Sequence, residues 1–199
     1  MHHLLVFARH PELGRVKTRL AATIGPEAAL EVYQALVQHT QQAANGLADV
    51  AKTVWFAEPA SSPDVADVWH GFKQEVQPGG DLGQKMQVAF AAAFHQGATS
   101  AVIIGTDCPA LTKGHLTDAF QALSTHDLVL GPAADGGYYL LGMKQLHSEL
   151  FQNKAWSTAD VLATTLADAA HLGLRVALLP VLRDIDTAED LAAWRATEQ

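Results

Sequence analysis

The sequence has one cysteine, few charged side chains and no long apolar run, and each shortage excludes a class of protein. The lone Cys108 excludes an internal disulfide and a cysteine-based metal site. Charged residues make up 17% of the 199 residues and hydrophobic ones 49%, which excludes a disordered chain. No apolar run approaches the ~20 residues of a membrane helix. The N-terminus has no signal-peptide pattern, so we expect a cytoplasmic protein without a membrane partner.

Basic side chains are also scarce, with 13 against 21 acidic ones and a net charge of −8. A broad nucleic-acid surface needs clustered Lys and Arg, so a nucleic-acid polymer is excluded as a partner. The ten histidines include no H-x-x-x-H pair, which argues against a zinc site. Yet Arg9, Arg15, Lys17 and Arg19 fall within one eleven-residue window. This window is either an anion site or a solvated basic loop.

Strand-like and helix-like patterns alternate along the chain, which predicts an α/β sandwich with a mostly parallel sheet in a single domain, residues 1–199. Between 127 and 142 two strands follow each other without a helix, which implies a local hairpin or a mixed sheet. The patterns predict strands at 3–8, 52–57, 73–77, 101–105, 127–131, 138–142 and 174–179, and helices at 27–44, 63–70, 82–94, 115–123, 158–171 and 187–196.

In such sheets ligands bind beyond the carboxyl ends of the strands, so polar residues just after predicted strands are the candidates. The basic window follows the first strand. There Gly14 permits close backbone approach, and Arg15, Lys17 and Arg19 supply donors suited to phosphate oxygens. The loop is neither a Walker A loop nor a dinucleotide fingerprint.

Asp107 follows the most apolar strand, where a carboxylate must be paired, hydrogen-bonded or bound to a metal. A carboxylate with phosphate oxygens and water is a typical Mg²⁺ environment. The alternative is that Asp107 caps the helix that begins near Thr112. Its neighbour Cys108 is either a small buried residue, which we favour, or a nucleophile.

Two further carboxylates have competing interpretations. Asp135, in Asp135-Gly136-Gly137-Tyr138, either forms a hairpin turn or belongs to the acceptor end of an active site. Asp186 is either part of a helix start, where Thr187 with Asp190 also fits a capping box, or a second metal ligand. Spacing leaves open whether Asp184 or Asp186 would bind the metal.

Two helix starts complete the candidates. Ser157 fits an N-cap, with Asp160 at the third helical position and Trp156 packing on Val161, although Trp156 and Ser157 also suit a substrate pocket. The segment Gly79–Lys85 opens a helix whose free N–H groups suit an anion or a base edge.

Together these motifs resemble a known family. FARxPxxGxVKTRL, GDLGQKM, GTDCPAL, GPAxDGGYYLLG, WST and DIDTxEDL, in this order, are similar to the glycosyltransferase-A-like proteins of the nucleotide-diphospho-sugar transferase superfamily, and most of all to the small bacterial arsenosugar-biosynthesis glycosyltransferase family. The resemblance covers Leu5 to about Leu191. It implies a Rossmann-like three-layer sandwich with a mixed, mainly parallel sheet that binds a nucleotide in its N-terminal half.

The resemblance also implies roles for residues. The loop with Gly14, Arg15, Lys17 and Arg19 would hold phosphates, while Asp107 matches a metal-binding aspartate and Asp186 the aspartate of a similar DTPEDL motif. Only one carboxylate stands where many glycosyltransferases have Asp-x-Asp, and the glycine-rich G-x-G-x-R loop of sugar nucleotidyltransferases is absent. By the same likeness, Gly80, Asp81 and Gly83 would lie near the nucleobase or ribose.

We therefore expect a Mg²⁺- or Mn²⁺-dependent transferase acting on a nucleotide-activated sugar. Asp107 and Asp186 would bind the metal, Lys17 would stabilise the leaving group, and Asp135 would orient or deprotonate an acceptor hydroxyl. A nucleotidyltransferase that joins a nucleoside triphosphate to a small phosphorylated acceptor is the alternative, and a non-catalytic nucleotide-binding module is the next. The predicted nucleotide contacts are Arg9, Gly14, Arg15, Lys17, Arg19, Gly80, Asp81 and Gly83; the predicted substrate pocket is Gly136, Gly137, Tyr138, Trp156 and Ser157.

Overall fold

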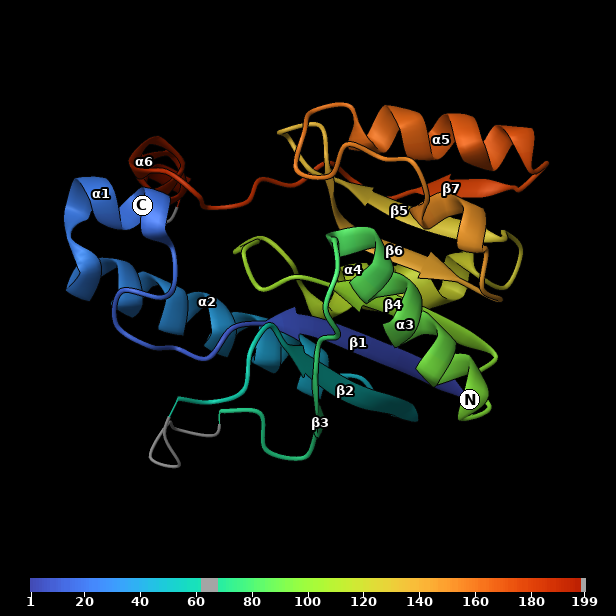
Figure 1. Ribbon diagram of the computed structural model, residues 1–199, viewed down its shortest axis with the longest axis horizontal. Coiled ribbons are helices and arrows are strands. Elements are labelled where there is room, and N and C mark those ends of the chain that lie inside the picture. Colours follow the sequence, from blue (N-terminus) through green and yellow to red (C-terminus); the bar gives the residue numbers. More distant parts are fainter. Residues whose placement is uncertain (62–67, 198–199) are drawn as a thin grey trace.

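A computed structural model describes residues 1–61 and 68–197 (Figure 1). Within them, seven strands form one sheet in the order β3-β2-β1-β4-β6-β5-β7. Six strands fall where apolar periodicity predicts them, and the short seventh falls within the range predicted for it. The strands are β1 (His2–Ala8), β2 (Val50–Phe56), β3 (Lys73–Val76), β4 (Ser100–Ile104), β5 (Leu128–Pro132), β6 (Tyr138–Met143) and β7 (Val176–Leu178).

The sheet is mixed, and β6 is its antiparallel strand. Strands β1, β2, β3 and β4 pair in parallel, as do β5 and β7, whereas β6 runs antiparallel to both β4 and β5. The turn before β6 contains Gly136 at φ +91°, a conformation that glycine adopts at little cost. Because this turn reverses the direction of the chain within a few residues, β6 begins at the edge of the sheet where the parallel strands end.

Helices cover both faces of the sheet, so the predicted three-layer architecture is confirmed. Helices α2 (Pro26–Asn45) and α4 (Lys113–Ala122) pack on the face that carries Val6 and Val102. Helices α3 (Leu82–His95) and α5 (Val161–His171), with the 3₁₀ turn η1 (Ser148–Phe151), pack on the other face. In a parallel sheet covered on both sides, strands are apolar on both faces, which explains why β4 is buried along its whole length.

A smaller cluster joins α1 (Thr18–Ile24) and α6 (Ala188–Thr197) to α2, and the three helices lie together at the left of Figure 1. Leu20 and Leu191 are buried there with Leu36. This cluster brings the chain after β1 and the chain after β7 to one end of the sheet. None of the helices within residues 1–61 and 68–197 is long and apolar enough to cross a bilayer.

Three local predictions differ from the structure. Helix α1 was not expected, because it has seven residues and begins at Thr18, after an N-cap residue, Lys17, that makes no side-chain capping hydrogen bond. Helix α5 starts at Val161 rather than at 158: Ser157 has φ +64°, so it cannot take the extended conformation of an N-cap. Most of the helix predicted at 63–70 lies outside the described residues, and residues 68–70 are not helical.

Candidate active site

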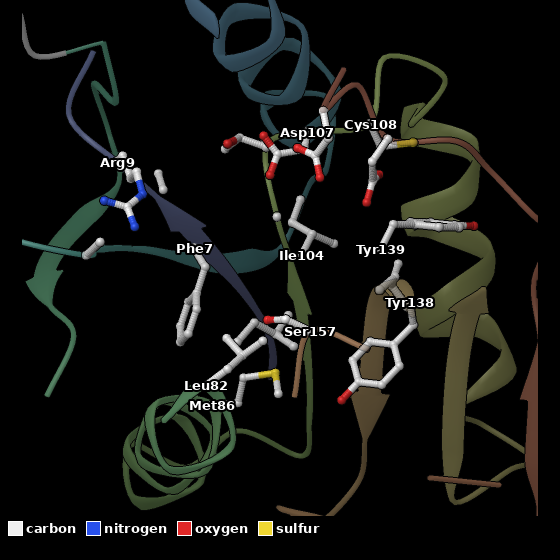
Figure 2. A pocket seen from close by; sticks show the side chains of 18 of the residues that line it. Phe7, Arg9, Leu82, Met86, Ile104, Asp107, Cys108, Tyr138, Tyr139 and Ser157 are labelled. Atoms are coloured by element: carbon white, nitrogen blue, oxygen red, sulfur yellow. The ribbon is translucent and has the colours of Figure 1, made fainter. Parts of the chain in front are cut away.

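A cavity of about 560 Å³ opens at the carboxyl ends of the parallel strands (Figure 2). The ends of β1 and β4 and the first residues of β6 line it, because β6 starts where β4 stops. This is the place where doubly wound sheets bind their ligands. Its size falls in the range of about 300–1,000 Å³ that is usual for small-molecule sites.

Lys17 lies at the centre of the polar wall. Its Nζ is 2.5 Å from Asp107 Oδ1 and 3.1 Å from Asp186 Oδ1, and it also donates to the carbonyl oxygen of Ile185. Only 5% of the Lys17 side chain is exposed, and its backbone is left-handed at φ 48°. Such a backbone costs a lysine about 1–2 kcal/mol, so contacts of the folded protein hold the ammonium in this place.

Asp186 reaches Asp107 through backbone contacts that the sequence does not reveal. The N–H of Ile185 donates to the carbonyl oxygen of Asp107 at 2.9 Å, which ties the segment after β7 to the end of β4. Just beyond, Thr187 and Asp190 form the expected capping contacts: the N–H of Asp190 donates to Thr187 Oγ1, and the N–H of Thr187 donates to Asp190. Asp186 is therefore free of the capping role and pairs with Lys17 and Arg19.

Asp184 adds a third carboxylate to this wall. Its Oδ1 is buried and has no hydrogen-bond partner among the described residues. Burial, and then the negative charges of Asp107, Asp135 and Asp186, raise the pKa of Asp184 to about 7. Asp184 is thus a carboxylate held in an environment that disfavours its charge, and an incoming cation would relieve that penalty.

Replacing Asp184 with asparagine is expected to remove a pH dependence of stability. The folded-state pKa of about 7 exceeds the unfolded value near 4, so the free energy of unfolding falls as pH rises between these values. At pH values above the folded-state pKa, the free energy of unfolding stays roughly 2–4 kcal/mol lower than it is below the unfolded-state pKa. Urea denaturation in EDTA at about pH 5 and about pH 8 measures it. A similar fall in wild type and Asp184→Asn contradicts this assignment.

The basic residues of the loop after β1 divide into two pairs. Lys17 and Arg19 face Asp186, and Arg19 donates to its carboxylate. Arg9 and Arg15 instead approach Glu58, at 3.9 and 3.7 Å, and line a small neighbouring pocket. Arg9 also borders the main cavity, which Lys85 borders too, whereas Gly14 and Arg15 do not line it.

The remainder of the cavity is largely apolar (Figure 2). Phe7, Leu82 and Met86 lie together below Arg9, and Tyr138 closes the opposite side. Tyr33 of α2 fixes the polar edge, because its hydroxyl donates to the carbonyl oxygen of Arg9 and accepts from the N–H of Arg9. An apolar floor with cations at one rim is a surface for a flat ring joined to an anionic chain.

Other predicted site residues have structural contacts of their own. Asp81 caps α3 by accepting from the N–H of Gln84 at 2.8 Å, after Gly80 at φ +111°. Asp135 accepts from the N–H of Gly137 at 2.9 Å in the turn before β6. The predicted residues that line the main cavity are Arg9, Lys17, Arg19, Asp107, Tyr138, Ser157 and Asp186; those that do not are Gly14, Arg15, Gly80, Asp81, Gly83, Asp135, Gly136, Gly137 and Trp156.

Asp107 does not cap helix α4. Thr112 fills the N-cap position, and its hydroxyl accepts from the N–H of His115. Asp107 is left free to face Lys17, so the capping alternative for this residue is wrong.

Cys108 is expected to react slowly with alkylating reagents. Its side chain is buried, and burial together with Asp184 and Asp107 raises its pKa to about 12, so almost no thiolate forms near neutral pH. We expect iodoacetamide to label the native protein at least about 100-fold more slowly than the urea-unfolded chain at the same pH. Comparable labelling rates in the two states contradict a structural role and reopen the alternative of a nucleophilic thiol.

The carboxylates of the polar wall can be compared with the ligands that a divalent cation requires. Within the described part of the chain, no three His, Cys, Asp or Glu side chains are arranged as a metal site. Mg²⁺, however, is commonly bound by one or two carboxylates, completed by phosphate oxygens and water. Asp107 and Asp186 provide two carboxylates, and the unpaired oxygen of Asp184 lies in the same wall. The donor set therefore fits a cation that arrives with phosphates.

Some lining residues were missed by the sequence interpretation. Tyr33, Gln77 and Lys85 border the cavity from α2, from the segment after β3 and from α3. Lys85 ends the segment Gly79–Lys85, which was predicted to open a helix, but was not itself named as a contact, and Gln77 lies two residues before this segment. Tyr33 is one apolar position of an amphipathic helix, and nothing local distinguishes it.

Comparison with known proteins identifies the family. Residues 37–158 match the model of a family described as an uncharacterized protein conserved in bacteria (DUF2064). The chain belongs to this family.

A crystal structure from Desulfovibrio desulfuricans G20, assigned as a nucleotide-diphospho-sugar transferase, matches 100% of this chain and 87% of its own at 31% identity and a TM-score of 0.93. The phosphoenolpyruvate guanylyltransferase of Chloroflexus aggregans is 29% identical over 194 residues, covering 92% of both chains. The predicted superfamily and the prediction of a transferase are confirmed by these relationships.

More distant structures share the fold alone. The glucosyl-3-phosphoglycerate synthase of Mycobacterium tuberculosis, in complex with Mn²⁺, uridine diphosphate and glucosyl-3-phosphoglycerate, has a TM-score of 0.60 at 14% identity. It covers 97% of this chain, and this chain covers 75% of its length. Structures of this fold thus include one with a nucleotide and a divalent metal.

Proposed function

We propose that this protein is a nucleotidyltransferase that joins a nucleoside triphosphate to a small phosphorylated acceptor and releases pyrophosphate. Glycosyl transfer from a nucleotide-sugar, which the motif resemblance favours, is the second candidate. The observation that carries the proposal is the buried ammonium of Lys17, held between Asp107 and Asp186 at the mouth of a cavity with an apolar floor.

The distribution of carboxylates favours nucleotidyl transfer. The carboxylates of the described residues that line the cavity, Asp107, Asp184 and Asp186, all stand at the Lys17 wall. Asp135 lies outside the cavity lining and accepts from the N–H of its own turn. An acceptor hydroxyl has to lose a proton to a base, whereas an acceptor phosphate oxygen is already an anionic nucleophile. A site without a base on its far side suits the phosphate.

The names of the relatives also favour nucleotidyl transfer over glycosyl transfer. The curated relative that matches almost the whole chain is named as a guanylyltransferase. The crystal structure from Desulfovibrio desulfuricans G20 is assigned to the nucleotide-diphospho-sugar transferases, and this name does not distinguish nucleotidyl transfer from glycosyl transfer. The proposal of glycosyl transfer thus rests on the motif resemblance, whereas the proposal of nucleotidyl transfer is supported by a relative of matching length.

The basic side chains that line the cavity have separate roles in this reaction. An acceptor oxygen attacks the α-phosphorus, the bond from that phosphorus to the β-phosphate oxygen breaks, and pyrophosphate leaves with the bonding electrons. Lys17 stabilises charge on the α-phosphate oxygens, and Arg19 beside it stabilises the departing pyrophosphate. Arg9 and Lys85 border the apolar floor that receives the nucleoside.

Asp107 and Asp186 would hold a Mg²⁺ or Mn²⁺ ion together with the phosphates, as predicted from the sequence. Such an ion neutralises phosphate charge and lowers the cost of gathering several anions in one cavity. Of the other predicted contacts, Gly14, Arg15, Gly80, Asp81 and Gly83 support the loops that border the nucleotide. Gly136, Gly137, Tyr138, Trp156 and Ser157 belong to the acceptor side, and Asp135 shapes the turn before β6.

The test is a product assay with purified protein and Mg²⁺. Each common nucleoside triphosphate is paired with small phosphorylated acids, with guanosine triphosphate and phosphoenolpyruvate as the first pair because of the curated relative. Pyrophosphate release that requires both partners supports the proposal. Release of a nucleoside diphosphate from a sugar nucleotide instead supports glycosyl transfer. Tight nucleotide binding with neither product indicates a non-catalytic binding module.

A further inference from the structure

One segment beside the cavity is held in an unfavourable backbone conformation. Residues 152–160, which we call the clasp, connect η1 to α5. Two of its non-glycine residues are left-handed, Asn153 at φ 53° and Ser157 at φ 64°. Backbone of this kind persists only where surrounding contacts enforce it, and it concentrates where side chains must be aimed. Ser157 is the clasp residue that lines the cavity.

The clasp sits directly on two glycines that were predicted as site residues. A Cβ at Gly83 would lie 2.5 Å from the ring of Trp156, and a Cβ at Gly136 would overlap the carbonyl of Ala159. The N–H of Leu162, just beyond the clasp, donates to the carbonyl oxygen of Gly136 at 3.0 Å. The clasp is therefore seated on both the start of α3 and the turn before β6, and only glycine leaves room for it.

An ion pair between a buried lysine and a partly exposed aspartate anchors the clasp to α5. Lys154 Nζ lies 2.5 Å from Asp168 Oδ2, and only 1% of the Lys154 side chain is exposed. A lysine is rarely buried so completely without a partner that fixes it. Because Asp168 lies on helix α5, the pair fixes the clasp relative to a helix of the sandwich. Lys154 makes this contact three residues before Ser157.

Ser157 stands where the apolar floor of the cavity meets the wall made by β6. Figure 2 shows it near Leu82, Met86 and Tyr138, well away from Asp107. Lys17 and Arg19 lie at the other rim, where the triphosphate has its counter-charges. The acceptor is left with the wall made by β6 and the clasp.

We propose that Lys154 is a positioning residue for the acceptor: its ion pair with Asp168 holds the clasp so that Ser157 faces the acceptor. This inference rests on the proposed nucleotidyl transfer. Lys154 itself does not line the cavity, so it acts through the clasp and touches neither substrate. Its loss weakens acceptor binding more than nucleotide binding, because the counter-charges of the triphosphate are Lys17 and Arg19, which belong to the loop after β1 and not to the clasp.

The test compares Lys154→Met and Asp168→Asn with Lys144→Met. Lys144 also pairs with an aspartate, Asp127 at 3.1 Å, but does not line the active-site cavity, so it controls for the loss of a lysine ion pair. Steady-state kinetics with nucleotide and acceptor varied separately is one readout. Amide hydrogen exchange of residues 155–160 is the other, and it needs no turnover.

Both clasp variants should raise the acceptor KM by about tenfold or more, leave the nucleotide KM within about twofold, and speed clasp exchange by about tenfold. Lys144→Met should change none of these. Unchanged clasp exchange in Lys154→Met, or equal changes in both KM values, overturns the proposal. Wild type that releases no pyrophosphate overturns the proposed function instead, while the exchange data still decide whether Lys154 anchors the clasp. A nucleotide-induced thermal shift equal to that of wild type shows that the variants are folded.

Discussion

Replacing Lys17 with methionine is expected to lower the rate of pyrophosphate release by about 100- to 1,000-fold. That is the usual cost of removing one fixed donor from a site where charge develops in the transition state. Methionine keeps much of the length and volume of the lysine stem, so the change isolates the ammonium that lies between Asp107 and Asp186. Steady-state assays of kcat with saturating nucleotide and Mg²⁺ measure the effect.

The control for Lys17→Met is Lys113→Met. Lys113 is an exposed residue at the start of α4, and it does not line the active-site cavity. It should retain a wild-type rate within about twofold, as surface substitutions do. If Lys17→Met also retains its rate, the buried ammonium is a structural counter-ion for the two carboxylates and takes no part in the reaction.

The second large effect is expected from Asp107→Asn. It removes the negative charge at the end of β4 while preserving size and hydrogen-bonding shape, and activity should fall by about 100-fold or more because cation binding is weakened. Mn²⁺ affinity in the presence of nucleotide, measured by electron paramagnetic resonance, should fall together with kcat. Addition of EDTA to wild type should abolish turnover, and excess Mg²⁺ should restore it.

Asp118→Asn is the matched control for this second substitution. Asp118 is exposed on α4 and does not line the cavity. We expect it to bind Mn²⁺ and to turn over as wild type does. Full activity of wild type in EDTA, or an unchanged Mn²⁺ affinity in Asp107→Asn, contradicts the assignment of a metal to this wall.

The layers of the fold were predictable because they depend on local periodicity. The continuous apolar run of β4 predicts a strand that is buried on both faces, and the amphipathic pattern of α2 predicts a helix with one buried face. The antiparallel position of β6 was predictable from the short Asp135-Gly136 turn. The start of α5 was not, because Ser157 fits a capping pattern while tertiary contacts impose a left-handed backbone on it.

The sequence predicted that site residues lie after the ends of strands, but it did not predict which of these residues come together in space. Asp107 comes just after β4 and Lys17 lies in the loop after β1, and adjacent parallel strands bring their ends together. Asp186 arrives through a backbone hydrogen bond from Ile185, and Arg15 turns away to Glu12 and Glu58. Both outcomes depend on contacts between segments far apart in the sequence, for which spacing carries no information.

The fate of an α-phosphate label tests the central claim most directly. The protein would be incubated with Mg²⁺, a phosphorylated acceptor and a nucleoside triphosphate labelled at the α- or the γ-phosphorus. Nucleotidyl transfer predicts that the α-label enters the acceptor product and that the γ-label leaves as pyrophosphate. If no triphosphate passes its α-label to any acceptor, and a sugar nucleotide instead yields a labelled nucleoside diphosphate, the account is contradicted.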